Sequence, residues 1–140
     1  MADAGRKIFL DTNVLIYAYS ETEVEKKIKV LPLLEDEPVS LSTQVVNEFV
    51  WVMNKKFNVS MDSLRQIVIN LFALYHVGVI NDTTITKAID MSSKLKLPYW
   101  DSLIVASAVE ADCDILYTED LQHGQVIENR ITVRNPFLDL

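Results

Sequence analysis

Four carboxylates occupy positions where a charged side chain is unusual. Two follow short apolar runs, one interrupts an apolar helical pattern, and one heads a helix that is apolar on nearly every side. They are Asp11, Glu48, Asp101 and Asp120. Carboxylates gathered without a cation would repel one another, and an all-oxygen set without zinc-type Cys or His spacing favours Mg²⁺ or Mn²⁺. The residue types therefore predict a divalent-metal site.

Asp11 comes directly after the apolar run 7–10, which we interpret as a buried strand. Ligands of open parallel sheets bind beyond the carboxyl ends of the strands, so this position is a site candidate. The alternative is a helix cap, because the apolar-periodic stretch 14–19 follows and Asp accepts hydrogen bonds from a first helical turn. If Asp11 binds metal, we expect capping to pass to Thr12 or Asn13.

Glu48 lies inside the strongly apolar helix predicted over 43–56. Val45 and Val52 stand three residues before it and four after it, which predicts that its side chain falls within an apolar stripe. An ionised carboxylate there would be costly without a partner. The partner could be a basic residue from elsewhere in the chain, or a metal ion.

Asp101 follows Pro98 and heads the helix expected over 103–111, whose packed surface would hold its amino end against the core. The alternative role is again an N-cap, because Asp suits the positive end of the helix dipole. Both interpretations place the carboxylate at the start of a buried helix.

Asp120 follows a second short strand, expected over 115–117. If that strand is parallel to the first, Asp120 and Asp11 emerge at the same edge of the sheet. We choose Asp120 over Glu119 because, in an extended continuation, Thr118 and Asp120 point to one side and Glu119 to the other. Asp114, at the start of the strand, is expected at the opposite edge in a structural role.

Short apolar runs alternate with helical patterns along the chain, which predicts an α/β fold with a mostly parallel sheet of four or five short strands flanked by helices. The 140 residues are expected to form one domain, 1–140. Further helices are expected over 23–35, 64–75 and 84–95, and further strands over 38–42, 77–80 and 131–133, the last at the sheet edge. Expected caps are Ser42 or Thr43, Ser60 or Asp62, and Asp82 or Thr83.

Composition limits the location and the partners. No apolar run reaches the ~20 residues that cross a bilayer, and the opening segment 1–6 is too polar to begin a signal peptide, so we expect a cytoplasmic protein with no membrane partner. The single cysteine, Cys113, is expected in the core. The net charge of −7 argues against sequence-independent adhesion to nucleic acid, which depends on Lys and Arg meeting phosphates.

The ordered motifs resemble those of the PIN-domain nucleases, specifically the small single-domain toxins of VapC type. The motifs are Phe9-Leu10-Asp11-Thr12-Asn13, Val46-Asn47-Glu48-Phe49, Tyr99-Trp100-Asp101-Ser102 and Thr118-Glu119-Asp120. The resemblance implies a PIN-like three-layer fold and an acidic quartet, Asp11, Glu48, Asp101 and Asp120, that holds Mg²⁺ or Mn²⁺. It also implies that Thr12, Asn13 and Thr118 support the quartet.

The resemblance further implies a metal-dependent endoribonuclease that hydrolyses RNA phosphodiesters, with a homodimeric state and a VapB-type antitoxin as partner. Metal-activated water needs no histidine, and His123 is expected to be loop structure. The rim lysines, Lys55, Lys56, Lys94 and Lys96, are expected on solvated faces. The pair Tyr99-Trp100 is expected in the core, with a surface for a splayed RNA base as the alternative.

Three other functions compete with the nuclease. A catalytically silent PIN-like module would act only as a dimer or protein-binding unit. A phosphatase of haloacid-dehalogenase type would want a second Asp where Asn13 stands, and a larger chain. A receiver domain would want an acidic pair ahead of Asp11 and would leave Glu48 without a role. No Gly-rich phosphate loop is present.

Overall fold

The computed structural model describes residues 6–36 and 38–140, so most of the polar opening segment lies outside the described residues. At its centre is a six-stranded sheet in the order β3-β2-β1-β4-β6-β5. Its strands are β1 (Ile8–Leu10), β2 (Val39–Ser42), β3 (His76–Gly78), β4 (Ile115–Tyr117), β5 (Val126–Ile127) and β6 (Ile131–Arg134). All neighbouring pairs are parallel except β5 with β6. The predicted mostly parallel sheet is confirmed, but the prediction of four or five strands is wrong, because the sheet has six.

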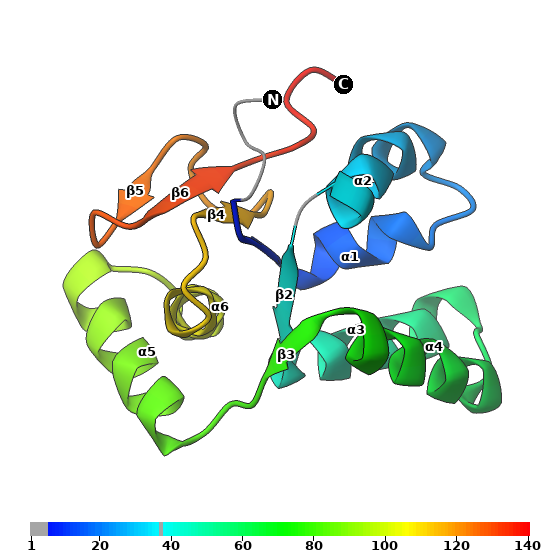
Figure 1. Ribbon diagram of the computed structural model, residues 1–140, viewed down its shortest axis with the longest axis horizontal. Coiled ribbons are helices and arrows are strands. Elements are labelled where there is room, and N and C mark those ends of the chain that lie inside the picture. The colour runs from blue at the N-terminus through cyan, green and yellow to red at the C-terminus, as the bar shows by residue number, and fades with distance from the viewer. Residues whose placement is uncertain (1–5, 37) are drawn as a thin grey trace.

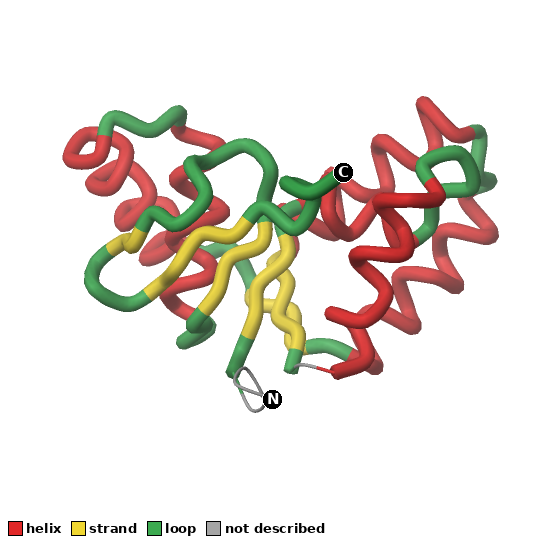
Figure 2. The backbone as a smooth tube through the Cα atoms, turned by 90° about the horizontal axis from the view of Figure 1, so that it is seen from above, coloured by secondary structure: helices red, strands yellow, loops and turns green. Residues whose placement is uncertain are grey.

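Helices cover both faces of this sheet. Figures 1 and 2 show α5 and α6 on one side and α1 to α4 on the other, which gives the three layers that were expected. The helices are α1 (Thr12–Ala18), α2 (Val24–Asp36), α3 (Thr43–Phe57), α4 (Met61–Leu74), α5 (Asp82–Leu95) and α6 (Tyr99–Glu110).

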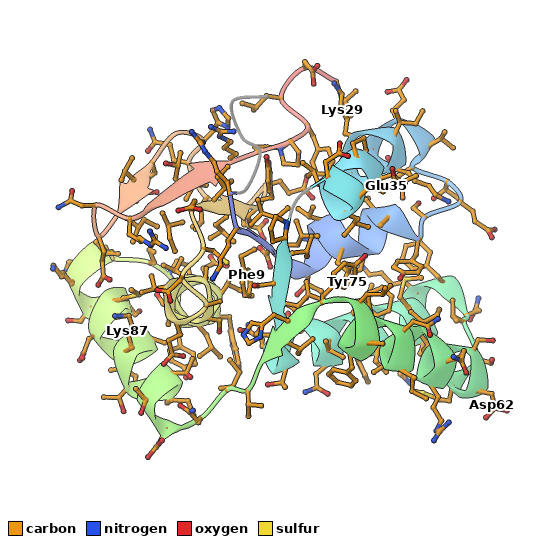
Figure 3. The ribbon with its side chains drawn as sticks, in the orientation of Figure 1. Phe9, Lys29, Glu35, Asp62, Tyr75 and Lys87 are labelled. Carbon is orange, nitrogen blue, oxygen red and sulfur yellow. The ribbon has the colours of Figure 1, made fainter. Side chains whose placement is uncertain are left out.

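The central strands are short and apolar because they are buried from both sides. β1 and β4 are buried at every position, as parallel strands beneath two helical layers must be. Phe9 lies in the interior of the molecule in Figure 3, while the labelled charged residues Lys29, Asp62 and Lys87 lie at its periphery. Cys113 is fully buried, as expected. Within the described ranges, no helix is long and apolar enough to cross a membrane.

The caps of α3 and α4 are those expected from the sequence, whereas the cap of α5 is not. Ser42 caps α3 and Ser60 caps α4, each accepting a hydrogen bond from a backbone amide in the first turn. The expectation of Asp82 or Thr83 as the cap of α5 is wrong. Asn81 is the cap and forms a capping box with Thr84, which satisfies two groups reciprocally.

The predicted sheet edge is also wrong. We expected the strand at 131–133 to be the last one, but β6 has β5 outside it, paired antiparallel with Ile127 opposite Ile131. β5 has only two residues, too few to give a recognisable alternation in the sequence. β6 is therefore an internal strand, which explains why Ile131 and Val133 are fully buried.

Candidate metal centre

Asp11 is held at the carboxyl end of β1 by two hydrogen bonds. Thr12 N donates to Oδ1 at 2.7 Å, and Thr118 Oγ1 donates to Oδ2 at 2.8 Å. The side chain is only 8% exposed. Asp11 is itself the N-cap of α1, so the expectation that capping passes to Thr12 or Asn13 is wrong. Each carboxylate oxygen has a second lone pair, so capping leaves acceptor capacity for an ion.

Two threonines connect the acidic residues. Thr12 Oγ1 donates to Glu48 Oε1 at 3.4 Å, which links α1 to α3. Thr118 Oγ1 donates to Asp11 and also accepts from the Asp120 backbone amide at 3.1 Å. Both threonines are buried, and the Thr118–Asp11 hydrogen bond is shielded from water. Asn13, the third expected supporting residue, is exposed on the first turn of α1.

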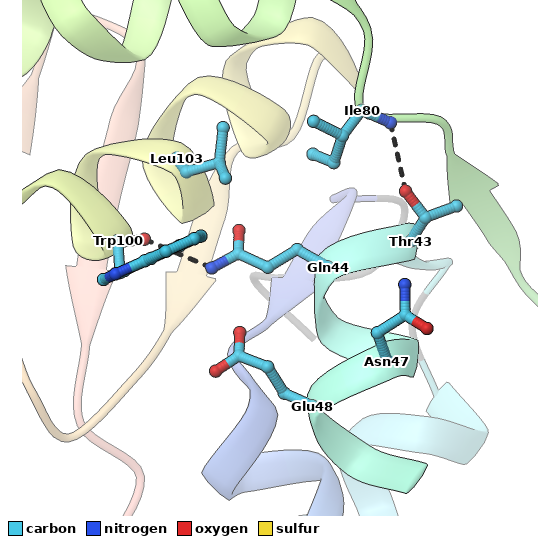
Figure 4. Close-up of a pocket in the computed structure, with 7 residues that line it drawn as sticks. All are labelled: Thr43, Gln44, Asn47, Glu48, Ile80, Trp100 and Leu103. Atoms are coloured by element: carbon cyan, nitrogen blue, oxygen red, sulfur yellow. Dashed lines mark hydrogen bonds between the residues drawn. The ribbon is translucent and has the colours of Figure 1, made fainter. Parts of the chain in front are cut away.

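Glu48 does not lie within an apolar stripe, because its side chain is exposed. The apolar stripe of α3 is formed by Val45, Phe49 and Met53, which are buried. Glu48 instead shares a helix face with Gln44, and Figure 4 shows its carboxylate beside the open space that Gln44 and Trp100 also border. The exposure of Glu48 leaves it accessible to an ion.

Asp101 is the third residue of α6 and is not its cap. The N-cap position is Pro98, which offers no side-chain hydrogen bond, so the alternative role of Asp101 is removed. Ser102 to Ala108 behind it are buried, which holds the amino end of the helix against the core as expected.

Asp120 follows β4, and β4 runs parallel to β1 with Leu10 opposite Tyr117. Asp11 and Asp120 therefore leave the sheet at the same edge. Glu119 is engaged elsewhere, because it accepts from Tyr17 Oη at 2.9 Å and pairs with Lys26 at 3.3 Å.

Asp114 is structural, as expected. At the other end of β4 it accepts from Lys7 N at 3.0 Å and lies 3.4 Å from Arg130 Nη1.

Electrostatics show that the four carboxylates act on one another. Burial raises the pKa of Asp11 from 3.8 to about 6; the hydrogen bonds from Thr118 and Thr12 lower it, and the charges of Asp120 and Glu48 raise it further. Although the Glu48 side chain is exposed, partial desolvation of its carboxylate raises its pKa. Gln44 and Thr12 lower that pKa, and the charges of Asp101 and Asp120 raise it further. Burial and the Asp120 charge raise the pKa of Asp101. The four residues come from separate elements of the chain, yet the pKa values of Asp11, Glu48 and Asp101 are each raised by the charge of at least one other member.

The donor set suits a hard divalent cation. Within residues 6–36 and 38–140, no three Asp, Glu, His or Cys side chains stand ready to enclose an ion. Mg²⁺ does not need such a cage, because it keeps several waters and is usually held through one or two carboxylates together with substrate phosphates. A bound cation would offset the electrostatic repulsion among the charged carboxylates.

Some residues outside the quartet differ from expectation. Trp100 is 67% exposed, so its expected place in the core is wrong, while Tyr99 is half-buried.

His123 is loop structure as expected, because its Nδ1 accepts a hydrogen bond from Asn135 N at 2.9 Å. The four rim lysines are exposed, as expected.

Sequence reasoning missed Gln44, which is buried beside Glu48. Its position four residues before Glu48, one helical turn away on the same face of α3, could have identified it.

Comparison with known proteins decides the family. The model of the PIN domain matches residues 8–128. This chain belongs to the PIN-domain family. The match spans most of the chain and includes all four carboxylates, so the resemblance inferred from the motifs is confirmed at the level of the family.

Solved structures with a similar fold include a toxin–antitoxin complex and a toxin. A toxin–antitoxin complex from Klebsiella pneumoniae is 20% identical, with a TM-score of 0.64 over 93% of this chain and 98% of that one. VapC20 from Mycobacterium tuberculosis, described as a Sarcin-Ricin loop cleaving toxin, is 14% identical, with a TM-score of 0.65 over 81% and 89% of the two chains. FitAB bound to a DNA fragment is 22% identical, with a TM-score of 0.68 over 92% and 94%. No curated protein sequence matches.

Proposed function

We propose that this PIN-domain protein is an endoribonuclease that hydrolyses RNA phosphodiester bonds with Mg²⁺ or Mn²⁺, and that it is the toxin of a toxin–antitoxin pair. One observation carries the proposal: Asp11, Glu48, Asp101 and Asp120 come from separate elements and interact at one edge of the sheet. A structural ion pair would not require four carboxylates within range of one another's charge.

The chain's own residues have distinct parts in this proposal. Asp11, Glu48, Asp101 and Asp120 would hold the ion, which when bound supplies an activated water and neutralises charge on the phosphate oxygens. Thr118 and Thr12 orient Asp11 through hydrogen bonds that favour its charged form. Thr12 also orients Glu48. These threonines are positioning residues, because they act through the carboxylates.

The proposed partners follow from the same comparisons. The likeness to toxins in toxin–antitoxin complexes supports a VapB-type antitoxin as the inhibitor of this site. Exposed apolar side chains such as Phe72 and Leu74 on α4 are compatible with a homodimer or another protein interface. We propose a cytoplasmic location, where RNA and antitoxin are both accessible.

The test is RNA cleavage with Mg²⁺, with Mn²⁺ and with chelator. Asp11→Asn and Asp101→Asn remove one charge each without changing the size of the side chain, and Asp90→Asn on the exposed face of α5 is the matched control. Cleavage is expected to require metal, to be lost in the two site variants, and to persist in the control. Cleavage that continues in chelator, or that is unchanged in Asp11→Asn and Asp101→Asn, would overturn the nuclease proposal.

The silent module and the phosphatase give different results. A silent PIN-like module would bind metal without cleaving RNA. A phosphatase would release inorganic phosphate from a phosphomonoester such as p-nitrophenyl phosphate, with the same loss in Asp11→Asn. Both assays use the same protein preparations as the cleavage test.

A further inference from the structure

A cavity of about 480 Å³ opens beside the acidic cluster, between α3 and α6. Glu48 is a member of the acidic cluster and also lines the cavity, so the cavity adjoins the candidate metal centre. Its walls are partly apolar, from Ile80 and Leu103, and partly polar, from Asn47 and Gln44 (Figure 4). Its volume is in the range of small-molecule sites.

An exposed indole borders this cavity. Trp100 is 67% exposed, although it lies in the first turn of an otherwise buried helix. Tyr99 contacts it edge to face, with ring centroids 5.3 Å apart at 68°, and so restricts the orientation of the Trp100 ring. A large aromatic surface held in place beside a cavity is suited to stacking on another flat ring.

One of the residues that line the cavity carries a buried acceptor without a partner. Gln44 is only 9% exposed, and its Oε1 is the buried side-chain N or O atom that lacks a hydrogen bond in the described part of the chain. Its Nε2 donates a hydrogen bond to the Trp100 carbonyl at 3.4 Å. This hydrogen bond directs Nε2 towards α6 and leaves Oε1 as the unpaired atom of the amide. An unsatisfied buried oxygen costs free energy that a donor from a ligand would recover.

We propose that this cavity binds one nucleobase of the RNA substrate next to the cleaved phosphodiester, with the base stacked on Trp100 and an N–H of its edge donated to Gln44 Oε1. This inference rests on the proposed function and adds the recognition of a base to it. Single-stranded RNA is commonly bound by stacking of splayed bases on aromatic side chains and by hydrogen bonds to the base edges.

The net charge of the chain favours this mode of binding. With a net charge of −7, the protein has little general attraction for phosphates. Stacking and a neutral hydrogen bond do not depend on basic residues. A base held in the cavity would therefore supply affinity and selectivity that the surface charge does not.

The first experiment measures base binding without metal and without cleavage. The ¹⁵N-labelled protein in chelator is titrated with adenosine, an uncharged probe, and the indole N–H signals of Trp100 and Trp51 are followed by NMR. Trp51 is the internal control, because it is 64% exposed on α3 but does not line the cavity. The Trp100 signal is expected to shift with saturation while that of Trp51 stays in place. If neither signal moves, or both move alike, the proposal is overturned.

The second experiment tests the hydrogen bond to Gln44. Purine riboside has the ring of adenosine but no amino group, so it stacks without offering an N–H. Adenosine is expected to bind about fivefold more tightly, the value of one ordinary hydrogen bond. Gln44→Met, which keeps the side-chain length but removes the acceptor, is expected to bind the two nucleosides equally. Equal binding by the unaltered protein would overturn the role of Gln44.

Cleavage separates this inference from the proposed function. Trp100→Ala is expected to cleave a mixed-sequence RNA with weaker preference for the base beside the cut, whereas Trp51→Ala keeps the original pattern. If nucleosides shift Trp100 but no RNA is cleaved, the nuclease proposal fails and the base site stands. If RNA is cleaved but nucleosides leave Trp100 unmoved, the base site fails; that result is also expected if the cavity takes up a side chain of an antitoxin.

Discussion

The pKa of the Asp11 carboxyl is set by opposing effects of its immediate surroundings. Burial and two neighbouring carboxylates disfavour its charge, while hydrogen bonds from Thr12 and Thr118 favour it. The result is a pKa of about 6, close enough to neutrality for the proton to matter. Because a carboxylate must be deprotonated to bind an ion, a proton and the proposed metal ion would compete at this side chain.

This competition predicts how stability depends on pH in the metal-free protein. A carboxyl whose pKa is raised by folding binds more protons in the native state, so it contributes stability below its unfolded pKa that is lost as pH rises through the folded value. Between pH 4 and pH 7 the loss from Asp11 is about 2 kcal/mol, for a shift of about two pKa units. Asp11→Asn should be the more stable protein at pH 7, as measured by urea unfolding in chelator. An equal pH dependence in both proteins would contradict the assigned shift.

Thr118 provides a second prediction at the residue scale. Thr118→Val removes the hydroxyl that donates to Asp11 but keeps the shape of the side chain. Proton competition at Asp11 should then be stronger, and the affinity for Mn²⁺ at pH 7 should fall about 10- to 100-fold, as for other supporting residues of metal sites. Thr118→Ser should restore most of the affinity. Calorimetric titration with Mn²⁺ at pH 6 and pH 8 checks this, since the defect should be smaller at the higher pH.

At the scale of elements, the site depends on where each helix begins. α1 starts at the residue after Asp11, and α3 starts directly after β2, so Glu48 is fixed relative to Ser42 by just over one and a half helical turns. Ser42 is fully buried and its Oγ accepts from Val45 N at 3.3 Å. The cap of α3 therefore influences both stability and the position of Glu48.

Two caps provide a matched comparison. Ser42→Ala and Ser60→Ala each remove an N-cap, of α3 and α4 respectively, and each should lower the free energy of unfolding by about 1 kcal/mol. Only α3 carries Glu48, so only Ser42→Ala should also weaken Mn²⁺ binding. Thermal unfolding and calorimetric titration of the two variants check the pair. Equal metal affinity in both would show that the cap does not position Glu48.

At the scale of the whole molecule, the parallel sheet brings remote parts of the chain to one edge. Asp11 and Asp120 are far apart in sequence but follow adjacent strands. Asp101 arrives on α6 from the opposite helical layer (Figure 1). The proposed site can form only in the folded state, so an ion that binds there would stabilise the folded protein.

Mn²⁺ should accordingly raise the melting temperature. A ligand that binds only the folded state stabilises it by about 2.7 kcal/mol at one hundred times its dissociation constant. The shift should grow with Mn²⁺ concentration and should be absent in Asp11→Asn, while Asp90→Asn behaves like the unaltered protein. Differential scanning calorimetry in a chelator-free buffer measures it. An equal shift in Asp11→Asn would indicate binding elsewhere.

Much of this protein could be predicted from local sequence alone. The strands at Ile8–Leu10 and Ile115–Tyr117 and the helices of the flanking layers follow from apolar periodicity, and Asp120 was preferred to Glu119 from strand alternation. These features depend on neighbouring residues, whose relative positions the covalent chain sets. The family followed from the order of the acidic motifs.

Tertiary structure decided what depends on partners remote in sequence. Whether Glu48 is buried, whether Trp100 is in the core, and whether β6 is at the edge all depend on which element packs against them. Asp11 was expected to be either a cap or a ligand, but its two oxygens accept from Thr12 and Thr118 and leave lone pairs free, so capping does not exclude binding an ion. The unsatisfied oxygen of Gln44 likewise has no local signal, because its environment is formed by α6, more than fifty residues further along the chain.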